Sequence, residues 1–285
     1  MTGCERDGSS WREETISELV WQAARPWVMY ADFTRHEEAA VGADWLWWWV
    51  DATGECFGML VQAKRLHAVG NNWAIDFNAN KGEQMRRLFR TAEIFSVPAF
   101  YVLYMGGVNY RRSFSCGPNH GPECEQCKKV SVSVMAGLLA RLVGPSVRDG
   151  ANAALNYSVP LENLAESASE PIYDVNWKQV DADLRAFLLE GQTGARNVAK
   201  ILFSEVSSVR SGMFSADVAE RARVDSDVIF RDVPLDSAHF GIAYFDHVLR
   251  GLRRSPPAYV QYIMAGREPS RSLTANVAGV VVIPC

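Results

Sequence analysis

The sequence predicts a mixed α/β protein that folds as one domain, and three observations support this prediction. Segments whose apolar residues recur every three or four positions alternate with short aromatic and β-branched runs, which indicate amphipathic helices and buried strands. Apolar residues make up 48% of the 285 residues and charged residues 22%, a balance typical of a globular protein with a large core. No repeat, low-complexity tract or clear linker divides the chain, so we expect a single domain over residues 1–285 with an elaborated, mainly helical C-terminal half.

The first predicted elements are two helices separated by a proline. The apolar residues of segment 11–24, among them Ile16 and Val20, are spaced by three and four positions. Pro26 breaks this helix, because proline cannot supply the main-chain N–H of a helix interior. A second short helix is expected over 27–40.

A β-hairpin is predicted next. Aromatic and β-branched residues fill both alternating faces of segment 44–51, which favours a buried strand. A turn at 53–54 leads into a second apolar strand over 56–61, which continues into 62–64. We expect the two strands to pair antiparallel.

The remaining elements are predicted by the same criteria, and each is given by its range. We expect helices at 82–95, 130–143, 177–190, 193–206 and 237–253, strands at 99–105, 258–264 and 277–283, a Gly- and Cys-containing loop at 106–127, and less regular chain at 145–172.

Composition restricts the function classes. The chain carries 29 Lys and Arg against 33 Asp and Glu, a net charge of −4, so a nucleic-acid surface must be a local basic patch. No apolar run reaches the roughly 18 residues of a membrane-spanning helix, so no membrane partner is expected. The first residues lack the apolar stretch of a signal peptide, so we expect a cytoplasmic protein with reduced cysteines. No Gly-rich phosphate loop suggests ATP or a dinucleotide.

Polar residues are predicted to converge at one end of the hairpin. If the turn centres on Gly54, Asp44 lies opposite Lys64, about 5 Å away, or one residue from that position if the loop is shorter. Gln62 and Lys64 are two residues apart and therefore share one face of their strand. Glu38, six residues before Asp44, can reach the same place from the end of the preceding helix.

This set of residues has the chemistry of a site for a hard cation. Mg²⁺ or Mn²⁺ prefers oxygen ligands, here the carboxylates of Glu38 and Asp44, the Gln62 amide oxygen and the Ala63 main-chain carbonyl. Lys64 can orient an attacking water and neutralise charge that develops on a phosphoryl group. Taken singly, each residue also has a structural interpretation, because Asp often caps a strand start and Lys is often solvated at a strand end.

The order of these motifs resembles a known superfamily. The pattern Glu38-x-x-x-Gly42-Ala43-Asp44, then two apolar strands closing on Gln62-Ala63-Lys64, resembles the PD-(D/E)XK (restriction-endonuclease-like) nucleases. It is similar especially to the Mrr-like branch, in which Gln replaces the usual acidic residue before the Lys. The next helix with Gln84 and the strand at 98–104 fit the same order. The segment 13–44 is similar to an uncharacterised bacterial family within that superfamily, and the resemblance covers roughly residues 12–105.

The resemblance implies a restriction-endonuclease-like fold, with a nuclease-like core over about 12–145 and a C-terminal elaboration over about 146–285. It implies that Asp44 is the main metal ligand, Lys64 the catalytic lysine, Gln62 the counterpart of the second acidic ligand and Glu38 an accessory ligand. The implied activity is that of a Mg²⁺-dependent endonuclease that hydrolyses phosphodiester bonds. DNA is the favoured partner, and defence against foreign DNA is a role suggested by analogy.

Two alternatives stay open. A neutral amide binds Mg²⁺ less strongly than a carboxylate, so Gln62 also fits a weak or inactive nuclease-fold protein that binds nucleic acid without cutting it. The elaborated half, 146–285, also fits an interaction or effector protein that uses the core as a scaffold. Homo-oligomerisation stays open as well.

Basic residues cluster near the predicted site. Phosphate contact needs such local donors, although solvated helix faces are the alternative for each cluster. Another group, which includes Arg250 and Arg253, lies later in the chain. The candidate nucleic-acid contacts are Arg65, Lys81, Gln84, Arg86, Arg87, Arg90, Arg111 and Arg112.

The loop at 106–127 carries a second metal pattern. Cys116, His120, Cys124 and Cys127 place four ligands of the kinds that zinc prefers within twelve residues. With all four positions filled by protein, such a Zn²⁺ would be structural. The alternative is a loop with free thiols.

Overall fold

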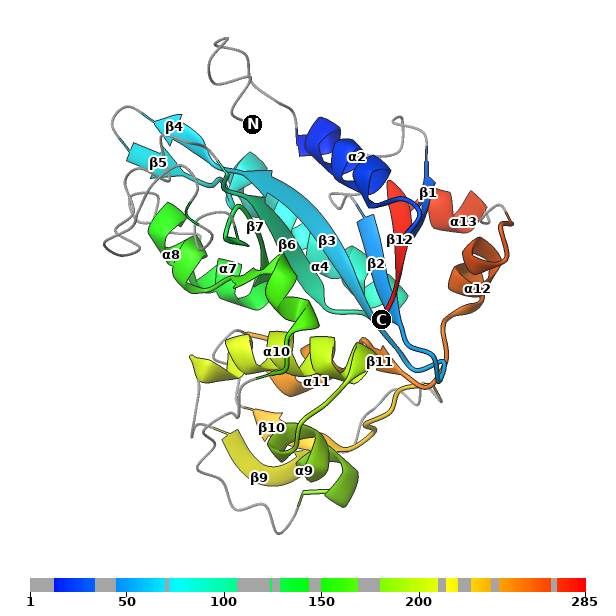
Figure 1. Ribbon diagram of the computed structural model, residues 1–285. Helices are drawn as coiled ribbons and strands as arrows, with labels where there is room; N and C mark the ends of the chain where they lie inside the picture. The colour runs from blue at the N-terminus through cyan, green and yellow to red at the C-terminus, as the bar shows by residue number, and fades with distance from the viewer. Residues whose placement is uncertain are drawn as a thin grey trace.

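The computed structural model describes residues 13–33, 45–69, 72–106, 124, 129–143, 150–168, 180–209, 214–219, 227–236, 241–267 and 271–285. A mixed β-sheet forms the central layer, and helices cover it (Figure 1). In chain order, its eight strands are β1 (Met29–Asp32), β2 (Trp45–Val50), β3 (Cys56–Arg65), β6 (Ala99–Tyr104), β7 (Val132–Ala136), β8 (Val159–Pro160), β11 (Leu252–Arg253) and β12 (Gly279–Pro284). They lie in the order β1-β12-β2-β3-β6-β7-β8, and β11 pairs with the start of β3.

The other elements are helices and two small ribbons. The α-helices are α2 (Glu13–Ala24), α4 (Glu83–Phe95), α7 (Gly137–Val143), α8 (Gly150–Asn156), α9 (Ala182–Leu189), α10 (Gly194–Ser208), α11 (Tyr244–Leu249), α12 (Ala258–Met264) and α13 (Arg271–Thr274). The 3₁₀-helices are η1 (Ala79–Gly82) and η2 (Leu161–Ala165), and the ribbons pair β4 (His67–Val69) with β5 (Asn72–Ala74) and β9 (Phe214–Ala219) with β10 (Val233–Asp236). The mixed α/β class and a mixed sheet flanked by helices are therefore confirmed.

The predicted hairpin is present, with a different register. β2 and β3 pair antiparallel, but Trp47 faces Met59, whereas a turn centred on Gly54 would have placed it opposite Val61. The cause lies in the turn, where the Asp51 carboxylate accepts hydrogen bonds from the main-chain N–H and the hydroxyl of Thr53. These bonds centre the turn one residue earlier, and the pairing is shifted by two residues.

Three predicted elements differ from the structure because tertiary pairing decides between helix and strand in short apolar segments. The helix expected over 27–40 begins instead with β1, which pairs antiparallel with β12. The first part of the helix expected over 130–143 is β7, which pairs antiparallel with β6. The strand expected at 258–264 is the helix α12, which follows Pro257 at its N-cap.

The helix expected over 237–253 is also shorter than predicted. Its described part is α11, and the chain then turns through Gly251 into β11, which pairs with β3. The close approach explains the glycine, because a Cβ at position 251 would collide with the main-chain carbonyl oxygen of Gly58. The predicted helix extended past this turn because Leu252 is apolar and fits the helical pattern of the sequence.

Helices α2 and α4 cover opposite faces of β3, because successive side chains of a strand point to opposite sides. Lys64 contacts Gln84 of α4, whereas Met59, five residues earlier on β3, points to the opposite face together with its partner Trp47. Trp21 of α2 packs edge-on against Trp47, with ring centroids 5.0 Å apart. Figure 1 shows α2 in front of the sheet and α4 behind it.

The last strand belongs to the centre of the sheet. β12 lies between β1 and β2 and runs parallel to β2, from Gly279 opposite Trp45 to Pro284 opposite Val50. The sheet therefore takes strands from both halves of the chain. Within the described ranges, no helix combines the length and the apolar character that crossing a membrane would require.

Candidate active site and basic helix

Lys64 is a buried cation near the end of the central strand β3. Its side chain is only 6% exposed, and its ammonium donates a 2.6 Å hydrogen bond to the Oε1 of Gln84. Parallel pairing with β6 places Lys64 opposite Leu103 and Gln62 opposite Tyr101. The strand order thus fixes the lysine in a protein interior, where a charge is costly unless it has partners.

Gln84 holds this lysine without neutralising it. The residue lies in the first turn of α4, and its amide oxygen is the acceptor of the Lys64 bond. An amide oxygen orients the ammonium but adds no negative charge of its own. The sequence suggested Gln84 as a contact for nucleic acid, which stays a prediction, and the structure shows its amide oxygen bound to Lys64.

Gln62 and Lys64 lie on the same face, as the spacing predicted. The Gln62 side chain is 1% exposed, so it belongs to the interior beneath α4. Glu38 and Asp44 lie outside the described residues, so the convergence of the four predicted residues is described only for Gln62, Ala63 and Lys64.

The described residues do not complete a cation site by themselves. They contain no group of three or more His, Cys, Asp or Glu side chains able to hold a metal ion. Gln62 and the carbonyl of Ala63 offer neutral oxygens, whereas Mg²⁺ in proteins is usually bound through one or two carboxylates. A Mg²⁺ or Mn²⁺ ion would therefore depend on Glu38 and Asp44.

Glu13, the first residue of α2, places its carboxylate at the end of β3. The sequence suggested no role for this residue. Its Oε1 accepts a 3.0 Å hydrogen bond from the main-chain N–H of Arg65. Nearby, the hydroxyl groups of Ser17 and Tyr104 are 2.9 Å apart and share a hydrogen bond. These contacts fix α2 on the end of β3, and no periodic pattern in the sequence announces them, because they join residues far apart in the chain.

Three of the predicted phosphate contacts share one carboxylate. Glu83 binds Arg86 at 2.9 Å, Arg87 at 3.4 Å and Arg90 at 2.8 Å along the exposed side of α4. These neighbours, Arg86 first, hold the pKa of Glu83 below its usual value. Because Arg86 and Arg90 share this one carboxylate, the described part of this surface carries more positive than negative charge at these residues.

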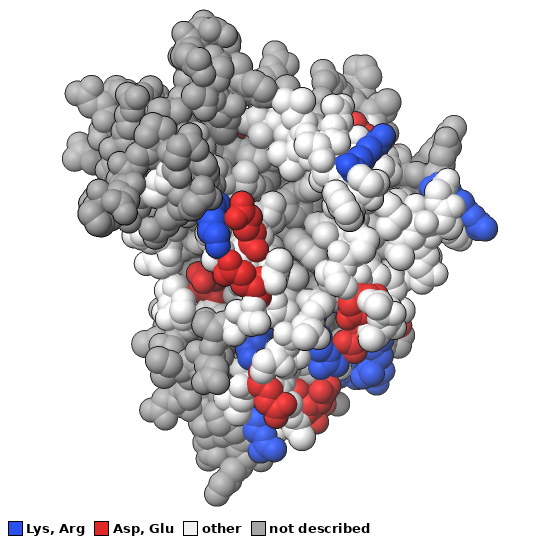
Figure 2. Space-filling view, in the orientation of Figure 1, with Lys and Arg blue, Asp and Glu red and all other residues white. Residues whose placement is uncertain are grey.

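The other predicted basic contacts are spread more widely. Arg65 is half-buried and Lys81 is exposed, while Arg111 and Arg112 lie outside the described residues. The face seen in Figure 2, which α2 and α10 cover, carries basic and acidic residues side by side. The excess of positive charge on α4 belongs to the other side of the sheet.

Arg250 and Arg253 belong to the structural core. Both side chains are buried and bind main-chain carbonyls at the C-terminal end of α4: Arg250 binds that of Val97, and Arg253 binds those of Phe95 and Ser96. Donors at this end satisfy carbonyls that the helix leaves free. The grouping of these arginines in the sequence therefore reflects a helix cap.

The predicted zinc site cannot be followed in the structure. Cys116, His120 and Cys127 lie outside the described residues, and Cys124 is described as half-buried. Cys56 is buried between β2 and β11, and burial raises the pKa of its thiol to about 12. A thiol of this kind is a packing residue, because the thiolate is the reactive form.

Comparison with known proteins places the chain in one family. No curated protein and no solved structure is similar enough to the chain to count as a match. A family profile matches residues 3–284, which is nearly the whole of the 285 residues. The chain therefore belongs to the DUF6615 family, a family of unknown function.

Proposed function

We propose that this protein is a metal-dependent nuclease that hydrolyses phosphodiester bonds, with DNA as the favoured substrate. The observation that carries the proposal is the buried ammonium of Lys64, held by Gln84 on the same strand face as Gln62. Burying a lysine costs free energy, so its place in the interior suggests that its charge has a use. Phosphodiester hydrolysis provides one, because negative charge develops on the phosphoryl oxygens in the transition state.

The order of elements supports the proposal. A helix (α2) precedes the β2–β3 hairpin, and the next helix (α4) crosses over to β6, which pairs parallel with β3. This is the order expected for a restriction-endonuclease-like core, with the Gln-x-Lys motif on the central strand. The insertion of β12 between β1 and β2 is an addition to that order.

The metal would be held mainly by Glu38 and Asp44, with the neutral oxygens of Gln62 and Ala63 completing the set. A bound Mg²⁺ would supply an activated water and a charge that polarises the phosphoryl oxygens. The protein itself positions a second positive charge, because the hydrogen bond to Gln84 restricts where the Lys64 ammonium lies. An ammonium fixed before the substrate arrives needs little reorganisation during the reaction.

A cleavage assay on the full chain tests the proposed activity. We expect plasmid DNA to be cut with Mg²⁺ or Mn²⁺ and to stay intact with a chelator, and an RNA arm establishes which nucleic acid is preferred. Asp44→Asn and Glu38→Gln should each reduce the rate by at least about a hundredfold, as loss of a metal ligand does. Cleavage that persists with a chelator would contradict the metal site. Cleavage at the wild-type rate by both variants would contradict it as well.

One observation favours a second function. The described part of the site offers neutral oxygens where this chemistry usually has an acidic residue, and that arrangement suits a protein that binds nucleic acid without cutting it. The same assay distinguishes the two functions when a binding measurement is added. Metal-independent binding of DNA, without cleavage under any metal, would support the binding function and exclude the nuclease.

A further inference from the structure

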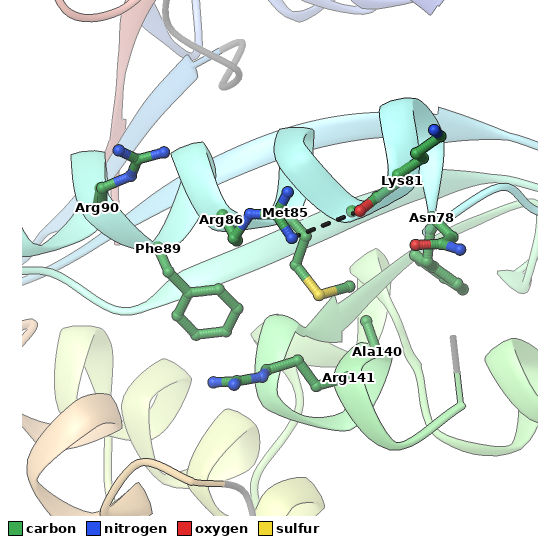
Figure 3. A pocket seen from close by; sticks show the side chains of 10 residues that line it. Asn78, Lys81, Met85, Arg86, Phe89, Arg90, Ala140 and Arg141 are labelled. Atoms are coloured by element: carbon green, nitrogen blue, oxygen red, sulfur yellow. Dashed lines mark hydrogen bonds between the residues drawn. The ribbon is translucent and has the colours of Figure 1, made fainter. Parts of the chain in front are cut away.

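A pocket of about 600 Å³ lies between α4 and α7, outside the Lys64 site (Figure 3). None of Gln62, Lys64 and Gln84 lines it. Its volume falls within the range of roughly 300–1,000 Å³ typical of small-molecule sites. The pocket is therefore a second place at which the protein can hold a ligand.

The interior of the pocket is apolar and partly aromatic. Figure 3 shows the side chains of Met85 and Phe89 pointing from α4 toward α7. Phe77 lines the pocket as well, and Ala140 of α7 leaves space opposite them because its side chain is small. Phe77 and Phe89 are only 3% and 9% exposed, so they form a small apolar floor, and a flat apolar group would contact this floor and the Met85 thioether.

The rim of the pocket is positive. Lys81, Arg86, Arg90 and Arg141 all line it, and no acidic residue from the described ranges does. Arg86 and Arg90 share the single carboxylate of Glu83. Among the described residues, no carboxylate forms an ion pair with Lys81 or Arg141. An anionic group at this rim would meet several cations whose charge is largely uncompensated.

Main-chain geometry adds donors to the same rim. Positive φ angles of 52°, 57° and 79° are found at Asn80, Lys81 and Gly82. Gly82 is the N-cap of α4, and the helix has no side-chain cap there. Two non-glycine residues in the left-handed region cost free energy, and such strain tends to be kept where it serves a function. The N–H of Glu83 donates to the main-chain carbonyl of Asn80, and Gly82 supplies no side-chain cap for the other N–H groups of the first turn, which suit a negatively charged ligand.

We propose that this pocket binds a nucleotide, with the base between α4 and α7 and the phosphate at the rim formed by Lys81, Arg86 and Arg141. The side chain of Arg141 lies beside the base position, its guanidinium carbon 5.5 Å from the centre of the Phe89 ring. A planar guanidinium stacks on a base as well as on a ring. The base of a nucleotide would contact the apolar floor, and its phosphate would contact the basic rim. A simple anion would contact the rim alone.

Titration calorimetry on the full chain tests this proposal, with AMP, dAMP, adenosine and inorganic phosphate as probes. We expect AMP and dAMP to bind, and adenosine and phosphate to bind at least about tenfold more weakly, because each lacks one half of the recognised group. Arg86→Gln and Arg141→Gln should each weaken AMP binding by about tenfold. The matched control is Arg185→Gln, an exposed arginine on α9, which should leave binding unchanged.

The outcome separates this proposal from the nuclease. Lys64→Met should keep the full affinity for AMP, because Lys64 does not line the pocket. A single-stranded oligonucleotide that competes with AMP would support the pocket and identify a strand end as the source of the nucleotide. The proposal is overturned if adenosine binds as tightly as AMP, if no nucleotide binds at about 1 mM, or if the control variant weakens binding as much as Arg141→Gln.

Discussion

At the scale of single residues, two lysines of the described ranges are buried, with different partners. Lys64 donates to the side-chain oxygen of Gln84, whereas Lys200 donates a 2.5 Å bond to the main-chain carbonyl of Glu190. The latter bond fixes the end of α9 on α10, so its purpose is structural. The partner of Lys64 is instead a side chain of α4, the helix that lies over β3, at the place where the sequence predicts the site.

We expect Lys200→Met to destabilise the fold. The substitution leaves the carbonyl of Glu190 without this donor, and a lost hydrogen bond to a charged group costs about 1.5–3 kcal/mol. The free energy of unfolding from urea denaturation measures the effect. Lys64→Met is the matched control and should change it by less than about 1 kcal/mol, because Gln84 is half-buried and its amide oxygen can bind water once the lysine is gone. Equal losses in both variants would assign the two lysines the same structural role.

His247 is predicted to make stability depend on pH. The residue is 1% exposed, and its Nε2 accepts a hydrogen bond from the main-chain N–H of Ala99. Burial, with Arg250 and Arg141 nearby, holds its pKa well below the usual value. The unfolded chain binds a proton below about pH 6.5 and the folded chain does not, so stability is full above that pH and falls as the pH decreases.

The slope from this group reaches about 1.4 kcal/mol per pH unit. In His247→Gln the amide oxygen can still accept from Ala99, but the group no longer titrates. Urea unfolding at about pH 7.5, 6.5 and 5.5 should therefore show a shallower pH dependence in the variant than in the wild type. Identical slopes in both proteins would exclude a neutral, buried His247.

At the scale of elements, the strongly patterned segments could be predicted from the sequence, and several short, weakly patterned ones could not. α2, α4, α10, the β2–β3 hairpin and β6 match their predicted ranges closely. Segments of about seven apolar residues carry no period that separates helix from strand, so β1, β7 and α12 were predicted wrongly. Each was decided by its partner: β1 by β12, β7 by β6, and α12 by its packing on β1 and β12.

The candidate site likewise contains some features that the sequence predicted and others that it could not predict. The pairing of Gln62 and Lys64 on one face follows from the period of a strand, so the sequence predicted it. Gln84 as the partner of Lys64 depends on how α4 lies over β3, and Glu13 as an acceptor for Arg65 depends on α2. The core role of Arg250 and Arg253 likewise depends on where α4 ends. Contacts between distant elements leave no periodic trace in a sequence.

Close packing of the β2–β3 hairpin makes Gly58 a specific requirement. A Cβ at this position would lie 2.5 Å from ring atoms of Trp48, which is fully buried and cannot move aside. We expect Gly58→Ala to lower the free energy of unfolding by about 1–3 kcal/mol, the usual cost of overpacking a core. Gly191→Ala is the control, because a Cβ there meets no atom within 4 Å. Urea denaturation of both variants measures the difference, and a neutral Gly58→Ala would contradict the packing.

At the scale of the whole molecule, the two ends of the chain meet in one sheet. β12 joins β1 to β2, so deletion of residues 146–285 would remove a central strand together with the elaboration. A truncated chain therefore cannot separate a scaffold from an effector half, and point variants in the full chain are the suitable tests. The net charge of −4 requires any nucleic-acid surface to be a local basic patch. The arginines of α4 are the candidate for such a patch, whereas the face in Figure 2 mixes both signs.

The central claim is that Lys64 serves chemistry, and one measurement tests it most directly. It is the rate of Mg²⁺-dependent plasmid cleavage by wild type, Lys64→Met and Lys200→Met, each well below its unfolding temperature. We expect Lys64→Met to lose at least about a hundredfold in rate, which corresponds to roughly 2.7 kcal/mol of transition-state stabilisation. Lys200→Met should cleave at the wild-type rate. Undiminished cleavage by a folded Lys64→Met protein would contradict the account.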